Sequence, residues 1–151
     1  MNPARKPGCL IIDANVFSLF GKTPINDKAA KLIAREVMGG NLRIASGGKN
    51  WRELAQMQDA GKWLSNRVRT GQAIRYDDSK VDSEEKRIIS GGGLESDDPH
   101  VIALSNVSGA KLLFSHDKHL HEDFKKICRG SIYQDASHHN LLKNRPPCNA
   151  P

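Results

Sequence analysis

The segment from Cys9 to Phe17 is the feature that most limits how this chain can fold. Its apolar residues, Cys9 to Ile12, run without polar alternation and are followed directly by a carboxylate, Asp13. A short strand that is apolar on both faces is typical of the interior of a parallel sheet covered by helices. We therefore predict a buried strand over residues 9–13 that carries Asp13 to one edge of a sheet.

The rest of the chain alternates between strand-like and helix-like segments. Asn26 or Asp27 can cap a helix whose apolar positions recur at helical spacing as far as Val37, and Gly39 follows as a stop. Further strands are predicted at residues 42–45, 73–76, 111–114 and 132–133, and further helices around residues 51–58, 63–70, 79–89, 99–108 and 120–127. This alternation predicts a three-layer α/β/α sandwich with a mainly parallel central sheet.

Length and composition predict a single domain over residues 1–142. Residues 143–151, which include three prolines, are expected to form a disordered tail. No apolar run approaches the ~20 residues that cross a bilayer, so no membrane partner is expected. The basic stretch from Met1 to Pro7 lacks the features of a signal peptide.

The charge balance favours a polyanionic partner, since 23 lysines and arginines against 17 acids give a net charge of +6. The cysteines Cys9, Cys128 and Cys148 are too few and too scattered to predict a disulfide framework. We therefore expect a reducing, cytoplasmic location.

Several acids are placed where a parallel sheet would gather them. Asp13 and Asp117 follow predicted strands, Asp98 precedes Pro99 at a helix start, and Glu53 lies on the helix after the second strand. Carboxylates that share one crevice repel each other, so a fold that assembles them normally holds a divalent cation. Ligands that offer only oxygen select hard ions, which predicts Mg²⁺ or Mn²⁺.

Three segments resemble the motifs of the PIN-domain nucleases. They are residues 11–16 (IIDANV), 98–104 (DPHVIAL) and 113–120 (LFSHDKHL), and the intervening segment 51–54 (WREL) aligns more loosely. The resemblance extends from about Cys9 to about Tyr133. It implies a metal-dependent endonuclease that acts mostly on RNA. Because many small members are the toxins of toxin–antitoxin pairs and often form homodimers, an antitoxin and a second copy of the chain are expected partners.

The resemblance also assigns roles to residues of this chain. The implied catalytic acids are Asp13, Glu53, Asp98 and Asp117, and the implied metal ligands are Asp13, Asp98, Asp117 and Asp97. Ser115 is expected to hold water or phosphate, and Asn15 is expected to orient Asp13. The candidate contacts to the nucleic-acid backbone are Lys22, Lys49, Arg52 and Lys118.

Other interpretations of the same residues remain open. Asp98 also suits the role of a simple helix cap. The functional alternatives are a metal-dependent phosphatase, a DNA nuclease and a non-catalytic PIN-like module that binds nucleic acid or protein. His116, His119 and His121 are spaced poorly for zinc and are expected in a solvated loop. Four further acids, Asp77, Asp78, Asp82 and Asp123, are interpreted as surface residues.

Overall fold

The chain forms alternating strands and helices in a computed structural model that describes residues 6–151. Most of the basic stretch from Met1 to Pro7, for which no signal peptide is predicted, therefore lies outside the described residues. The strands are β1 (Gly8–Ile12), β2 (Leu42–Gly47), β3 (Ala73–Tyr76), β4 (Leu112–Phe114) and β5 (Ser131–Tyr133). The α-helices are α1 (Ala14–Phe17), α2 (Lys28–Met38), α3 (Gly48–Ala55), α4 (Gln58–Arg69), α5 (Asp78–Gly91), α6 (Pro99–Ser108) and α7 (Lys118–Ile127), with 3₁₀ helices η1 (Ser18–Gly21) and η2 (Ala136–Leu142).

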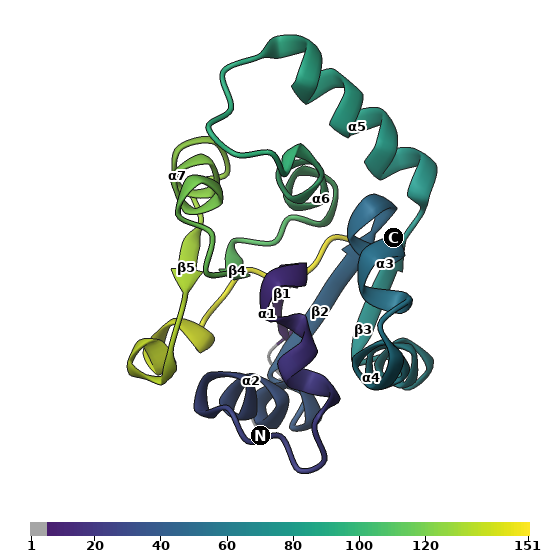
Figure 1. Cartoon of the computed structure of the whole chain (residues 1–151), viewed down its shortest axis with the longest axis vertical. Coiled ribbons are helices and arrows are strands. Elements are labelled where there is room, and N and C mark those ends of the chain that lie inside the picture. Colours follow the sequence, from purple (N-terminus) through teal and green to yellow (C-terminus); the bar gives the residue numbers. More distant parts are fainter. Residues whose placement is uncertain (1–5) are drawn as a thin grey trace.

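The strands form one parallel sheet in the order β3-β2-β1-β4-β5. The chain moves outward from β1 to β3, then returns to the other side of β1 for β4 and β5 (Figure 1). The point where the direction reverses, between β1 and β4, is where open α/β sheets place their ligands, just beyond the carboxyl ends of the strands. The N–H of Asp13 bonds the carbonyl of Phe114 at 2.9 Å, so the residues that follow these two strands lie side by side.

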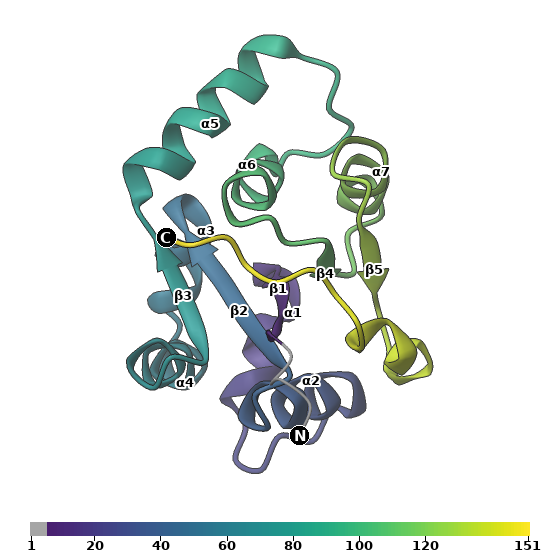
Figure 2. The same ribbon diagram turned by 180° about the vertical axis from the view of Figure 1, so that it is seen from behind.

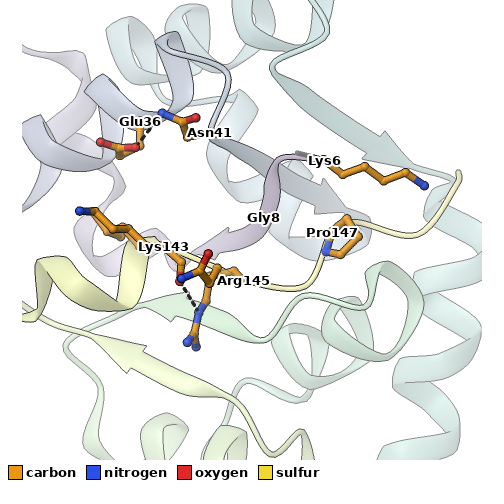
Figure 3. A pocket seen from close by; sticks show the side chains of 9 residues that line it. Lys6, Gly8, Glu36, Asn41, Lys143, Arg145 and Pro147 are labelled. Atoms are coloured by element: carbon orange, nitrogen blue, oxygen red, sulfur yellow. Dashed lines mark hydrogen bonds between the residues drawn. The ribbon is translucent and has the colours of Figure 1, made fainter. Parts of the chain in front are cut away.

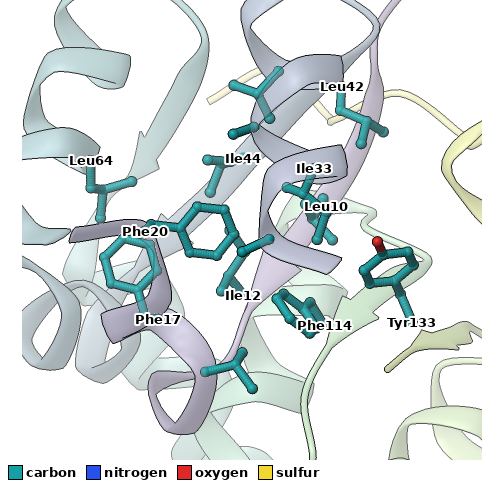
Figure 4. Close-up of a cluster of buried hydrophobic side chains, with 14 of the residues drawn as sticks. Leu10, Ile12, Phe17, Phe20, Ile33, Leu42, Ile44, Leu64, Phe114 and Tyr133 are labelled. Atoms are coloured by element: carbon teal, nitrogen blue, oxygen red, sulfur yellow. The ribbon is translucent and has the colours of Figure 1, made fainter. Parts of the chain in front are cut away.

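Helices cover both faces of the sheet, which confirms the predicted α/β/α sandwich (Figure 1). Alternate residues of β1 divide between the faces: Leu10 and Ile12 join one buried cluster, and Cys9 and Ile11 join the other. Helices α1 to α4 supply the first cluster, whose aromatic side chains pack together beside β1 (Figure 4). Helices α5, α6 and α7 supply the second cluster. No helix in the described part of the chain is long and apolar enough to cross a bilayer.

The C-terminal segment is ordered against the sheet, so the prediction of a disordered tail over residues 143–151 is wrong. The carbonyl of Pro146 accepts the N–H of Cys9 at 2.9 Å. Asn149 donates hydrogen bonds to two carbonyls of α6, and its own carbonyl accepts the hydroxyl proton of Tyr76. In Figure 2, which views the molecule from behind, this segment runs in front of the strands from η2 to the C-terminus near β3. Prolines limit helix formation but do not prevent an extended segment from lying along a strand.

A disulfide joins this segment to the central strand, contrary to the prediction from the cysteine pattern. Cys9 and Cys148 are bonded, with their Cα atoms 4.7 Å apart, while Cys128 is free and buried. The separation of 139 residues gives no local signal, because only the fold brings the two together. Such a bond forms in oxidising compartments and is rare in the cytosol, so its presence does not support the expected location.

The C-terminal segment also lines a cavity of about 440 Å³ near the starts of β1 and β2 (Figure 3). Three cationic residues line it, Lys6, Lys143 and Arg145. The carboxylate of Glu36 is also there and accepts a hydrogen bond from Asn41 at 3.0 Å. This end of the sheet is opposite the end that carries Asp13.

Candidate active site

The carboxylate of Asp13 is buried at the end of β1, with 5% of the residue exposed. Its Oδ2 accepts a hydrogen bond from the Ser115 hydroxyl at 2.7 Å, and the backbone N–H groups of Ala14 and Asn15 are near enough to lower its pKa. Burial raises the pKa of Asp13, and the charge of Asp117 adds to the rise, although the hydrogen bonds oppose it. Burying this carboxylate therefore costs free energy of folding.

Asp117 lies beside Asp13 and also begins α7. Its Oδ1 accepts the N–H groups of His119 and Leu120 at 3.0 and 3.2 Å, which is the geometry of an N-cap. The N–H of Asp117 donates to Ser115 Oγ at 3.1 Å, and that same hydroxyl donates to Asp13. Ser115 therefore fixes the two acid-bearing segments relative to each other.

Asp98 occupies the N-cap position of α6 without making a side-chain capping bond. Its pKa is raised to about 6, first by burial and then by the charges of Asp13 and Asp117, a hydrogen bond with Asp117, and the charge of Glu53. The alternative that Asp98 serves only as the cap of α6 is therefore not supported. Asp98 instead shares a negative environment with three other acids that the sequence analysis grouped.

Glu53 is fixed by a buried histidine that sequence reasoning missed. His100 Nε2 lies 3.1 Å from Glu53 Oε1, and only 1% of His100 is exposed. Burial, together with the charges of Lys49 and Arg52, lowers the pKa of His100 to about 4, so the ring is neutral at pH 7. Because Nδ1 has no partner among the described residues, the proton belongs on Nε2, which donates to Glu53.

A second missed pair supports the chain just before Asp13. Asn50, which is 1% exposed, donates from Nδ2 to the carbonyl of Ile12 at 3.1 Å and accepts the hydroxyl proton of Ser46 at 2.6 Å. The available signal was the i, i+4 spacing of Ser46 and Asn50 at the turn from β2 into α3. That spacing does not reveal the contact with β1, which depends on the sheet order.

Several residues that were assigned roles in the site lie elsewhere or are otherwise engaged. Asp97 is exposed and is not among the acids that act on the Asp98 pKa. The side chain of Asn15 is exposed, and only its backbone N–H reaches Asp13. Arg52 makes a two-pronged ion pair with Asp82, at 3.0 and 3.2 Å, and is less available to a phosphate.

Lys22, Lys49 and Lys118 are all exposed. Lys118 is the first residue of α7, directly after Asp117, and Lys49 is close enough to lower the pKa of His100. Lys22 follows η1 and lines a hollow with Met57 and Asp59. Lys49 and Lys118 are therefore the cations placed best for a polyanion that approaches the acids.

The prediction of a solvated loop is wrong for two of the three histidines near β4, because His119 and His121 are on α7. His121 is 5% exposed, and its Nε2 lies 2.6 Å from the carbonyl of Ser115. His116 is exposed and contacts the carbonyl of Gln134 at 3.1 Å. His121 therefore supports the segment between β4 and α7 rather than a zinc ion.

The side chains are suited to a hard cation by chemistry but do not form a closed cage. Within residues 6–151, no group of three or more histidine, cysteine, aspartate or glutamate side chains is arranged so that it could hold a metal ion. Mg²⁺ is commonly bound by only one or two carboxylates, with water and substrate phosphate completing its six ligands. Asp13, Asp98 and Asp117 offer such oxygens, and after burial the charges of Asp13 and Asp117 are the next causes of the raised pKa of Asp98.

Comparison with known proteins does not assign this chain to a family. No family model matches it, and no curated protein sequence matches it.

Proposed function

We propose that this protein is a metal-dependent endoribonuclease that hydrolyses phosphodiester bonds at the crevice between β1 and β4. The observation that carries the proposal is Asp98, whose carboxyl group leaves its helix uncapped and is near enough to Asp13, Asp117 and Glu53 for their charges to raise its pKa. A structural role alone gives no reason to accumulate mutually repelling acids at a ligand-binding position of the fold. The resemblance of the three acid-bearing segments to PIN-domain nucleases supports the same activity.

Mg²⁺ or Mn²⁺ would be held by one or two carboxylates from among Asp13, Asp98 and Asp117, with water and substrate phosphate as the other ligands, and when bound it would activate water and neutralise charge on the phosphate. The chain's own groups prepare that site. Ser115 orients Asp13 through its 2.7 Å hydrogen bond, and His100 orients Glu53. Asp98 holds a proton below about pH 6 and releases it above, so cation binding is favoured at neutral pH.

The net charge of +6 supports a nucleic-acid substrate, and RNA is the substrate class that the resemblance implies. Lys49 and Lys118 flank the acids and would contact the backbone of a bound strand without reading its sequence. By the same resemblance the protein would act as the toxin of a toxin–antitoxin pair, with an antitoxin and a second copy of the chain as its protein partners. A gene without a small neighbouring partner frame would count against that setting.

The decisive experiment compares wild type with Asp98→Asn on single-stranded RNA, structured RNA and DNA, in Mn²⁺ and in chelator. The matched control is Asp59→Asn, which removes an exposed acid on α4. We expect RNA cleavage by wild type and by the control in Mn²⁺ only, and none by Asp98→Asn. Equal cleavage by Asp98→Asn and wild type would sink the proposal.

The same assay separates the alternative functions. Preferential cleavage of DNA would indicate a DNA nuclease, and release of phosphate from a small monoester without RNA cleavage would indicate a phosphatase. Calorimetric titration with Mn²⁺ adds the remaining distinction. RNA binding without cleavage and without Mn²⁺ binding would indicate a non-catalytic module.

A further inference from the structure

Helix α7 carries a buried carboxylate that has no place in the proposed chemistry. Asp123, which the sequence analysis interpreted as a surface residue, is only 1% exposed. Its two oxygens accept the backbone N–H groups of Glu95 and Ser96, each at 2.9 Å. Burying a carboxylate is costly unless it is hydrogen-bonded, and bonds from N–H groups to a charged acceptor are about twice as strong as neutral ones. Asp123 therefore holds the backbone of another segment.

The segment that Asp123 holds is the loop between α5 and α6, which delivers Asp98. This loop begins with two exposed glycines, Gly92 and Gly93, whose φ values of 66° and 88° place them in the left-handed region. Such a start does not constrain the loop, so its position depends on later contacts. Beyond the anchored amides, Ser96 Oγ accepts the N–H of Asp98 at 3.3 Å. The anchor is thus two residues from the acid.

The same helix fixes the other acids. Asp117 caps α7, and His121, one turn further on, contacts the carbonyl of Ser115 at 2.6 Å. Ser115 in turn donates to Asp13. Figure 1 shows α7 beside α6, with β5 and β4 below them. One rigid element therefore contacts both the loop of Asp98 and the segment of Asp117.

We propose that Asp123 is a positioning residue for the acidic site, which sets Asp98 against Asp13 and Asp117 by anchoring the backbone at residues 95 and 96. The expected effect of this positioning on metal binding rests on the proposed function. Groups that orient metal ligands in this way typically change metal affinity by 10- to 100-fold when they are removed.

The test compares Asp123→Asn and Asp123→Ala with Glu122→Gln, which removes the exposed neighbouring charge on the same helix. The amide of Asp123→Asn keeps the size of the carboxylate but presents one oxygen and one donor, so it can accept only one of the two N–H groups. We expect Mn²⁺ affinity to fall by at least about tenfold in Asp123→Asn and further in Asp123→Ala. Glu122→Gln should bind Mn²⁺ as wild type does.

Amide hydrogen exchange gives a second readout that does not require metal. The amides of Glu95 and Ser96 should exchange faster in Asp123→Asn, with the change confined to residues 94–98. Faster exchange with wild-type Mn²⁺ affinity would overturn the positioning role, and unchanged exchange would overturn the anchor itself.

A third variant separates positioning from general destabilisation. Ile33→Val shortens a core side chain on α2, on the opposite face of the sheet, and serves as a variant that is destabilised away from the acids. An equal loss of Mn²⁺ affinity in Ile33→Val would mean that Asp123 acts only through stability. If wild type binds no Mn²⁺, the proposed function fails, while local faster exchange in Asp123→Asn would still support the anchor.

Discussion

The two ends of the central sheet differ in charge and in what they contribute to stability. At the carboxyl ends of β1 and β4, the charge of Asp117 contributes to the raised pKa of Asp13, and the charges of Asp13 and Asp117 contribute to the raised pKa of Asp98. At the opposite end, near the start of β1, the disulfide and the backbone bonds of the C-terminal segment hold the chain together. Lys6, Lys143 and Arg145 line the cavity there.

This difference indicates how the fold divides its tasks. Buried like charges cost free energy, and they persist only where the surrounding structure is stable enough to hold them. The disulfide at the other end closes a long loop and restricts the unfolded chain. We infer that stability is concentrated at the start of β1 and that the acidic end is free to be optimised for binding a cation.

Removing one buried acid should have the largest effect on activity and little effect on stability. In Asp13→Asn the amide oxygen can still accept the Ser115 hydroxyl, but the charge is lost. We expect single-turnover RNA cleavage to fall on the order of 10³-fold, since metal-assisted charge stabilisation is worth several kcal/mol. Urea unfolding should show unchanged or increased stability, because burial raises the pKa of Asp13. A variant that cleaves like wild type would refute this role.

Removing the disulfide at the start of β1 should lower the stability of the protein and leave its affinity for Mn²⁺ unchanged. Under oxidising conditions Cys148→Ser should lower the free energy of unfolding by about 3 kcal/mol, the typical contribution of a native disulfide. Affinity for Mn²⁺ should be unchanged, because Cys148 bonds Cys9 near the start of β1, away from Asp13. In excess reductant, wild type and variant should unfold together, which controls for the substitution itself. A loss of Mn²⁺ affinity would show that the ends are coupled.

The pH dependence of stability should reveal the repulsion at Asp98. Its folded pKa of about 6 is above the ordinary value of 3.8, so between these values the folded state holds a proton that the unfolded state has released. Stability from this group is therefore present below about pH 4 and is lost as the pH rises to about 6. We expect Asp98→Asn to exceed wild type by about 1–2 kcal/mol at pH 7 after allowing for partial exposure to solvent. The advantage should disappear near pH 4 in urea titrations without metal, and an equal advantage at both pH values would contradict the prediction.

Local patterns in the sequence were sufficient to predict the layers of the fold and to group Asp13, Asp98 and Asp117, whose charges act on one another in the structure. The run from Cys9 to Asp13 predicted the central strand, and Pro99 predicted the start of α6. Contacts that depend on distant segments had no local signal. Asp123 looks like any acid on an amphipathic helix, and Cys148 looks like part of a disordered tail. Their partners become visible only when the sheet order brings them together.

The smallest expected effect concerns the cations beside the acidic end. Lys118 is exposed and adjacent to Asp117, whereas Arg52 is held by Asp82. For single-stranded RNA each phosphate contact contributes about 0.7 to the slope of log affinity against log salt concentration. Lys118→Ala should therefore reduce that slope by about 0.7 and weaken RNA binding a few-fold at low salt. Arg52→Ala should change the slope less, because Arg52 is already paired with Asp82 and is therefore not expected to contact a phosphate. Fluorescence anisotropy across a salt series measures both slopes, and a larger change in Arg52→Ala would mean that RNA displaces Asp82 from its partner.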